Sequence, residues 1–283
     1  TASTLPIISM CNETQTPCIA SAATNTRVTV DEDTGETYPY LFRCCFIDPY
    51  QGTALADFAY NDLNITKVAT LTRVNNAYAV GVQEYFKNQY TALGGELVAE
   101  LGYQETEVEF RAQLTAAADS GAKAILVAAS EYKDAGLIAN QAKDLGLDFT
   151  FLLPDGVYAT ELLNVAGDAL TNAYISVGAD ENDPEFASWK ANFDDKHSSS
   201  GYTANIYTYY AMDSFMLLEY AVKTAGSTEG PAIRDALENA KDAPCFTENI
   251  TIDPSTHNPL NKSITLLTVQ DGAYSVYKTY KPE

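Results

Sequence analysis

Histidine, tryptophan and cysteine are scarce in this chain of 283 residues, which has two, one and five of them respectively. The small number of histidines, and cysteines that show no CxxC spacing, argue against a zinc site. Basic residues are also few, because 17 lysines and arginines face 38 acidic residues and leave a formal net charge of −21. Such a chain is poorly suited to neutralise phosphates, so no nucleic-acid partner is expected, and adsorption to an anionic membrane is disfavoured.

Long apolar runs are missing as well. No stretch approaches the roughly 18 uninterrupted apolar residues that a membrane span needs, so direct membrane insertion by this chain is not expected. The chain starts at Thr1 without a basic segment and apolar core, which indicates a processed chain that lacks its signal. The odd number of cysteines leaves disulfides open. Cys44 and Cys45 fit a buried strand, and a Cys11–Cys18 bridge is one alternative.

Catalytic motifs are absent from the chain. It has no GxSxG nucleophile elbow, no P-loop, no HExxH and no GxGxxG. His197 stands in a serine-rich loop and His257 in an expected turn, so neither marks a reaction centre. The abundance of acidic residues makes any single carboxylate pair uninformative. We therefore expect a protein that is not an enzyme, with no metal and no cofactor.

What the chain does have is an alternation of short apolar runs and amphipathic stretches. Strands are predicted at 67–72, 96–101, 124–128, 149–153 and 174–177. Helices are predicted at 78–90, from a Thr106–Glu109 capping box onward, at 132–145 and at 160–165. Continuous apolar strands that alternate with helices are typical of βαβ units around a parallel sheet. The pattern therefore predicts an α/β fold with parallel sheets flanked by helices.

The remainder of the chain is less regular. Helices are expected from 183 to 193, over 204–225 and within 227–240, where Pro231 stands in the first turn. After Cys245 the pattern predicts strands at 247–252, 263–269 and 274–280, with Asp271-Gly272 as a hairpin turn. This change of pattern indicates that the chain ends in β structure.

Residues suited to binding are better represented than catalytic ones. Ligands of parallel sheets bind beyond the carboxyl ends of the strands, and Asp155 directly follows one expected strand. Its carboxylate suits a ligand ammonium group, although an Asp-Gly turn accounts for the same residue. The small residues of Ser21–Asn25 follow another short apolar strand. Their N–H groups suit a carboxylate, with an ordinary polar turn as the alternative.

Nine ordered stretches of the chain resemble the branched-chain amino-acid (leucine/isoleucine/valine) substrate-binding proteins of ABC transporters. They are 17–25, 40–43, 48–52, 67–69, 78–81, 94–98, 109–114, 141–146 and 225–228. The resemblance spans nearly the whole chain. It implies the two-lobed α/β fold of type I periplasmic-binding proteins, in which a hinge motion closes the lobes on a ligand.

The resemblance also implies a division of the chain. Residues 1–47 and 180–245 would form the first lobe, and residues 48–179 and 246–263 the second. Residues 264–283 would add a C-terminal crossing strand and hairpin. Family members carry further strands and helices ahead of the position of Thr1. The first lobe is therefore expected to be incomplete at its N-terminus, with part of the side-chain pocket missing.

The family's binding positions carry over to single residues of this sequence. The set is Thr1, Ala22, Ala23, Thr24, Tyr78, Tyr132, Asp155 and Tyr209. The loop that includes Thr24 matches the one that grips the backbone groups of a bound amino acid, and Thr1 matches a further carboxylate contact. Asp155 matches the acidic residue that takes the α-ammonium. The matched tyrosines would close over the ligand, with Tyr209 near the side-chain pocket.

These expectations lead to a hypothesis and its alternatives. The chain would capture a small amino acid, most simply a branched-chain one, and deliver it to the permease subunits of an ABC transporter. It would work outside the cell, as a surface lipoprotein or in the periplasm. The alternatives are a sensory or transport receptor for an amide, urea or an aromatic acid, an enzyme on this scaffold, and a truncated product without binding function.

Overall fold

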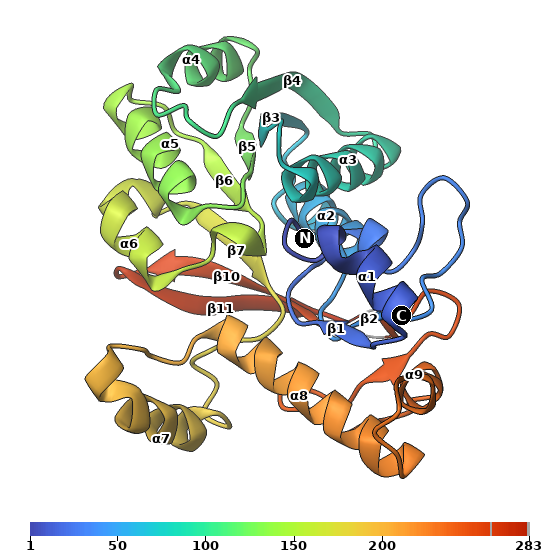
Figure 1. Cartoon of the computed structure of the whole chain (residues 1–283). Coiled ribbons are helices and arrows are strands. Elements are labelled where there is room, and N and C mark those ends of the chain that lie inside the picture. The colour runs from blue at the N-terminus through green and yellow to red at the C-terminus, as the bar shows by residue number, and fades with distance from the viewer. Residues whose placement is uncertain (261, 282–283) are drawn as a thin grey trace. The chain divides into compact units, whose positions relative to one another are not determined.

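A computed structural model describes residues 1–260 and 262–281 and divides the chain into two compact units (Figure 1). Unit 1 contains Thr1–Ile47 and Gly178–Ser263, together with Lys281. Unit 2 contains Asp48–Val177 and Ile264–Tyr280. The chain therefore passes between the units after Ile47, after Val177, after Ser263 and after Tyr280.

Unit 2 is built on one seven-stranded sheet with the order β11-β10-β7-β6-β5-β3-β4. The strands are β3 (Lys67–Arg73), β4 (Glu96–Tyr103), β5 (Ala124–Ala128), β6 (Thr150–Leu153), β7 (Ala173–Val177), β10 (Ile264–Gln270) and β11 (Ala273–Tyr280). Strands β3 to β7 pair in parallel, and β10 joins β7 in the antiparallel sense. The predicted α/β fold with a mostly parallel sheet is confirmed.

Helices cover both faces of this sheet, which explains why its central strands β5, β6 and β7 are almost entirely buried. They are α2 (Asp48–Asp57), the π-turn η3 (Phe58–Asp62), α3 (Ala77–Ala92), α4 (Arg111–Asp119), α5 (Tyr132–Asp144) and α6 (Thr160–Ala166). Phe58 and Phe86 pack against Leu126 of β5 on one face. Helices α4 to α6 lie on the other face (Figure 1). Every residue of β5 is consequently buried.

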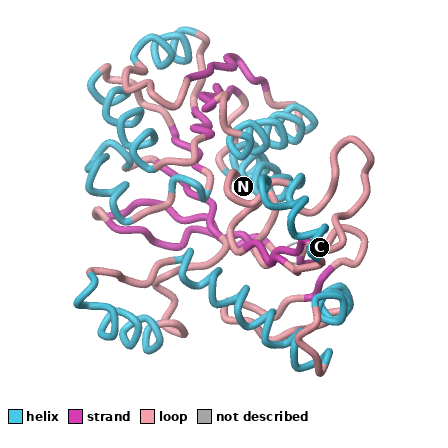
Figure 2. The backbone as a smooth tube through the Cα atoms, viewed as in Figure 1, coloured by secondary structure: helices cyan, strands magenta, loops and turns pink. Residues whose placement is uncertain are grey.

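Unit 1 has much less sheet than unit 2 (Figure 2). Its strands are β1 (Cys18–Ala20) and β2 (Leu41–Arg43), which pair in parallel, and β8 (Thr251–Ile252) and β9 (Pro259–Leu260), which pair in the antiparallel sense. Its helices are α1 (Ile8–Thr14), α7 (Ala187–His197), α8 (Ile206–Ala225) and α9 (Gly230–Glu238). Phe42 of β2 and Leu217 of α8 belong to a shared core with Leu237 of α9.

Local sequence accounts for both ends of α8. Asn205 is its N-cap, and the Asn205 side chain and the Thr208 hydroxyl exchange hydrogen bonds with the backbone as a capping box. The helix ends at Gly226, whose φ of 59° lies in the left-handed region that glycine adopts without steric cost. The expected helix at 204–225 is therefore present, but it begins at Ile206, two residues later than expected.

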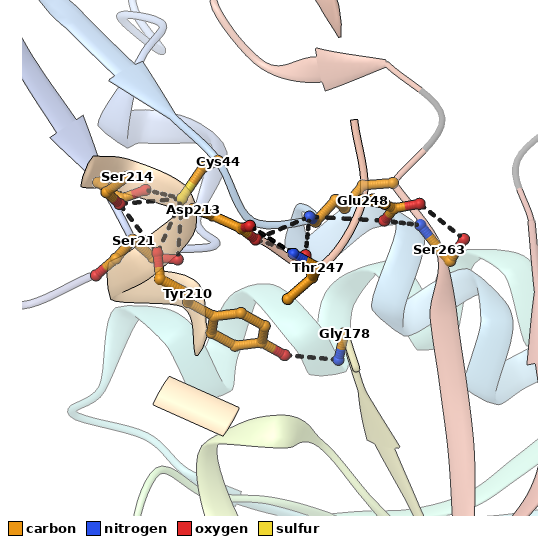
Figure 3. A network of polar contacts seen from close by, with 11 residues as sticks. Ser21, Cys44, Gly178, Tyr210, Asp213, Ser214, Thr247, Glu248 and Ser263 are labelled. Atoms are coloured by element: carbon orange, nitrogen blue, oxygen red, sulfur yellow. Dashed lines mark hydrogen bonds and ion pairs between the residues drawn. The ribbon is translucent and has the colours of Figure 1, made fainter. Parts of the chain in front are cut away.

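A buried polar network joins α8 to the segments that lead out of unit 1 (Figure 3). The Tyr210 hydroxyl accepts a hydrogen bond from the Gly178 N–H at 2.7 Å, beside the chain's crossing after Val177. The Lys262 ammonium lies 3.2 Å from the Asp213 carboxylate, next to the crossing after Ser263. Burial alone would lower the pKa of Lys262, but the Asp213 and Glu248 charges raise it above its usual value. These contacts stabilise the ends of the connecting segments within unit 1.

Three expectations about elements and boundaries are wrong. Helix α4 begins at Arg111 with Phe110 as its N-cap, so Thr106 caps no helix. Only two residues of the expected strand 247–252 are in β8, because Thr247 instead binds Asp213 through its N–H and hydroxyl. Residues 246–263 belong to unit 1, not to the second lobe, since their apolar side chains pack on α8 and α9. The hairpin β10–β11 extends the sheet of unit 2.

Candidate functional site

Asp155 lies at the carboxyl end of β6, in the first position of the short 3-10 turn Asp155–Val157. Its Oδ1 accepts a hydrogen bond from the Tyr78 hydroxyl at 2.5 Å, and the same hydroxyl accepts one from the Gly156 N–H at 2.8 Å. Tyr78 lies in the first turn of α3, which follows β3. Tyr78 and Asp155, both predicted to bind a ligand, thus lie in contact beyond the carboxyl ends of two strands of the sheet.

Gln51 completes this arrangement from α2. Its Oε1 accepts hydrogen bonds from the Asp155 N–H at 2.7 Å and from the Ser176 hydroxyl at 2.8 Å. The side chain is fully buried. We call Gln51, Tyr78, Asp155 and Ser176 the Asp155 cluster. Gln51 was not among the residues predicted to bind a ligand. A polar side chain among the buried positions of α2 is the feature that marks it.

Burial dominates the electrostatics of the Asp155 cluster. It raises the pKa of Asp155 to about 6, against hydrogen bonds from Tyr78 and Gln51 that lower it. Burial also raises the pKa of Tyr78 well above its usual value, and the Asp155 and Asp48 charges raise it further. At neutral pH the cluster therefore holds a buried carboxylate beside a neutral phenol. A cation that reaches this carboxylate gains a strong charge-assisted hydrogen bond.

Glycine is required next to Asp155 for steric reasons. A Cβ atom at Gly156 would lie 2.6 Å from Cε1 of Tyr78 and 3.1 Å from the carbonyl oxygen of Ala129. Both contacts are too close for a side chain, so the Tyr78 ring can approach the turn only because residue 156 is glycine. The Asp-Gly pair is thus a turn, as the alternative interpretation had it, and it also positions the carboxylate.

Tyr132 has a different environment in unit 2. It is the first residue of α5, half-buried, and the Lys133 ammonium lies 5.9 Å from its ring centroid. It follows β5, the neighbour of β6 in the sheet, so it belongs to the same sheet edge as Asp155. A partly exposed ring in this position is available for contact with a ligand, and its role as a lid stays a prediction.

The Ser21–Asn25 loop follows β1 in unit 1, as expected. Ala23 and Thr24 are buried, and Ala22 is half-buried. The Thr24 hydroxyl has no hydrogen-bond partner among the residues that the structure describes. In the same described part of the chain, the N–H groups of Ala22, Ala23 and Thr24 have no partner either. The loop therefore offers a set of donors that suits an anionic group.

Arg43 holds this loop in place from β2. Its guanidinium donates hydrogen bonds to the carbonyl oxygens of Ala23 at 2.7 Å and Asn25 at 2.8 Å, and to the Thr29 hydroxyl at 3.2 Å. The side chain is fully buried. The guanidinium binds carbonyl oxygens of the loop, and these bonds do not involve the N–H groups of Ala22, Ala23 and Thr24. A charged residue inside the apolar run 40–46 was the signal for this role, which the sequence analysis did not assign.

The other two expected binding residues of unit 1 lie elsewhere. The ligand contact of Tyr209 stays a prediction, and the structure places its ring fully buried in an aromatic core, 5.0 Å from the Phe186 ring and 5.2 Å from the Phe246 ring. Its hydroxyl donates to the carbonyl oxygen of Glu181 at 3.2 Å. Thr1 uses its own carbonyl oxygen to accept hydrogen bonds from Thr4 and Leu5, and its ligand contact stays a prediction.

Two features of the described residues bear on other classes of function. Across residues 1–260 and 262–281, no three histidine, cysteine or acidic side chains lie together in an arrangement that could hold a metal ion. Within those same ranges no helix has both the length and the apolar character of a membrane span.

Each unit by itself presents polar groups of the kind with which α/β proteins bind small ligands. In unit 2 they form the Asp155 cluster at the carboxyl edge of the sheet, and in unit 1 they lie in the donor-rich loop. Comparison with known proteins agrees with this class. Residues 1–273 match the family described as periplasmic binding protein, and the chain belongs to this family.

Individual relatives are moderately similar. Leu/Ile/Val-binding protein homolog 1 of Brucella suis biovar 1 (strain 1330) is 27% identical over 198 residues, which are 70% of this chain and 52% of that protein. The chain thus spans about half the length of this curated relative. The structure is similar to a leucine-binding protein LivK from Thermotoga maritima, with 27% identity and a TM-score of 0.89 over 100% of this chain and 78% of that one. It is also similar to LivJ from Streptococcus pneumoniae in complex with isoleucine, with 26% identity and a TM-score of 0.84 over 100% and 77% of the two chains.

Proposed function

We propose that this chain binds a small amino acid with an apolar, branched side chain and supplies it to the permease subunits of an ABC transporter. The proposal implies a place of action in the periplasm or at the outer cell surface. Its main support is Asp155, a carboxylate buried at the edge of the sheet where parallel α/β domains bind ligands. The relatives named for leucine, isoleucine and valine support the choice of side chain.

In this proposal each charged group of the amino acid has its own partner. The α-ammonium binds the Asp155 carboxylate, and Tyr78 and Gln51 hold that carboxylate in position. The α-carboxylate binds the Thr24 hydroxyl and the N–H groups of Ala22, Ala23 and Thr24. A zwitterion needs both an acceptor and a set of donors that are shielded from water, and the chain has one of each.

Calorimetric titration with leucine and two of its analogues tests this assignment. We expect leucine to bind, and 4-methylpentanoate, which lacks the amine, to bind much more weakly. Asp155→Asn should weaken leucine binding by about 30-fold or more, because loss of one partner of a desolvated charged pair costs about 2–5 kcal/mol. 3-Methylbutylamine, which lacks the carboxylate, should lose most of its affinity even with Asp155 in place.

Asp168→Asn is the matched control, because Asp168 is an exposed aspartate of the same unit that pairs with Lys143 at the surface. This variant should bind leucine as the parent does. The amino-acid assignment fails if none of the twenty amino acids binds, or if Asp155→Asn and Asp168→Asn bind leucine equally well. Preferential binding of an amide, urea or an aromatic acid would instead favour the alternative receptor class.

A further inference from the structure

Two thiols of unit 1 lie side by side in a segment that the binding proposal does not use. Cys11 is buried in α1, and Cys18 is the half-buried first residue of β1. Both side chains belong to the same apolar cluster, which also contains Tyr40 and Leu41. The Cys11 thiol is close enough to Cys18 to raise the pKa of the Cys18 thiol. The two cysteines are thus neighbours in space as well as in sequence.

The backbone between them explains this proximity. Helix α1 ends at Thr14, and Gln15 adopts a left-handed φ of 54° that turns the chain back. The Thr16 N–H then donates to the carbonyl oxygen of Cys11 at 2.9 Å. The Cys18 N–H donates to the carbonyl oxygen of Tyr40 at 2.8 Å, which places β1 beside β2. The turn therefore brings the start of β1 against the last turns of α1.

The other cysteines are arranged differently. The Cys44 sulfur is fully buried, 3.1 Å from the Ser214 hydroxyl oxygen, and burial raises the pKa of its thiol far above the usual value. Cys45 is its direct neighbour in the chain and is also buried. Cys245 packs against the apolar cluster that contains Cys44, but its pKa is not affected by another cysteine. Among the five thiols, Cys11 and Cys18 are thus the pair in which one thiol affects the pKa of the other and one member is partly accessible.

We propose that Cys11 and Cys18 form a reversible disulfide that ties α1 to β1. The oxidant is a small-molecule disulfide, such as oxidised glutathione. The thiolate of one cysteine attacks a sulfur of this compound, forms a mixed disulfide and releases one thiol. The second cysteine then attacks the protein sulfur and releases the second thiol. One protein dithiol and one small disulfide become one protein disulfide and two small thiols, so atoms and electrons balance.

Burial of Cys18 makes the rate of this exchange dependent on pH. Burial and, to a smaller extent, the neighbouring Cys11 together raise the pKa of the Cys18 thiol to about 11. Only the thiolate attacks, so the reaction through Cys18 should become about tenfold faster for each pH unit from 7 to 9. The finished bridge would tighten the base of β1, directly ahead of the Ser21–Asn25 loop. The proposal does not depend on which ligand the loop binds.

Peptide mapping of the native protein tests the pair directly. The protein is incubated with oxidised glutathione at pH 8.5, free thiols are alkylated under denaturing conditions, and the chain is cut with trypsin. Cleavage after Arg27 leaves both cysteines in peptide 1–27, whereas Cys44 and Cys45 fall in 44–67 and Cys245 in 242–262. We expect peptide 1–27 to be lighter by two hydrogens and to carry no alkyl group.

Variants separate this bridge from other oxidation products. Cys11→Ser and Cys18→Ser should each abolish the mass loss in peptide 1–27, and Cys245→Ser should leave it intact. The oxidised parent should melt several degrees higher than the reduced one, because the bridge restricts the unfolded chain. The double variant should show no oxidant-dependent shift. Two alkyl groups or a stable glutathione adduct on peptide 1–27 after oxidation would overturn the proposal.

Discussion

Replacement of Asp155 by asparagine should stabilise unit 2 at neutral pH while it removes ligand binding. Asparagine keeps the size of the side chain and an oxygen that accepts the Tyr78 hydrogen bond, but it has no charge to bury. The buried aspartate has a pKa of about 6 instead of its ordinary 3.8. Each unit of pKa difference corresponds to about 1.4 kcal/mol, so the ionised carboxylate costs up to about 3 kcal/mol above pH 6.

The sign of the pH dependence follows from the direction of this shift. The folded-state pKa lies above the unfolded-state value, so the folded protein binds the extra proton between about pH 4 and pH 6. The contribution of Asp155 to the free energy of unfolding therefore falls as the pH rises through this window, and it is constant above it. Asp155→Asn has no such titration. The variant's advantage should be near zero at pH 4 and about 1–3 kcal/mol at pH 7.

The measurement is urea denaturation of the ligand-free parent and variant from pH 4 to pH 7.5. The single tryptophan, Trp189, lies in unit 1, so its fluorescence does not report on unit 2. Circular dichroism should be used instead, since most of the parallel sheet belongs to unit 2. A variant that is less stable than the parent at pH 7, or a stability difference that does not change with pH, would refute the argument.

Other variants test the remaining contacts. Arg43→Met should destabilise unit 1 by about 2–4 kcal/mol in a Trp189 fluorescence titration, because two buried carbonyl groups lose their donors, and equal stability would refute its role. Lys262→Met should cost about 3–5 kcal/mol, since it leaves the buried Asp213 without its cation, and a second change of Asp213 to leucine should recover most of this loss. Tyr209→Phe should lower stability by about 1 kcal/mol and leave leucine affinity unchanged in calorimetry, whereas weaker binding would restore Tyr209 to the site. Leucine affinity of the parent should fall about tenfold per pH unit below pH 6, as Asp155 gains its proton, and a flat profile would contradict the ammonium contact.

Periodicity was sufficient to predict the central part of the sheet of unit 2, because its central strands are buried on both faces and alternate with helices that carry apolar stripes. The hairpin turn at Asp271-Gly272 could also be predicted from the sequence, and both residues adopt the positive φ angles that such a turn needs. Thr106 and Glu109 show where local patterns fail. The spacing fits a capping box, but Phe110 packs fully buried and the helix starts after it.

The candidate site could be predicted only in part, because local patterns do not contain contacts between distant residues. Asp155 follows an apolar strand and Thr24 lies in a run of small residues, so rules of local position select both. Gln51 and Arg43 act through contacts with residues 104 and about 20 positions away in the chain. No local pattern contains such partners. The three aromatic rings around Tyr209 could not be predicted either, because an isolated tyrosine in a helix gives no sign of what its ring contacts.

The sequence by itself therefore determined the α/β class, the parallel direction of the central strands and the carboxylate that follows β6. These features depend on the period of apolar residues and on short-range turn chemistry, which neighbouring residues encode. Only the tertiary structure decided the order of the strands, which polar side chains are buried, how strongly burial raises the pKa of Asp155, and which thiol affects the pKa of another. Burial and contact are properties of surfaces brought together from distant parts of the chain, so they exist only after the chain has folded.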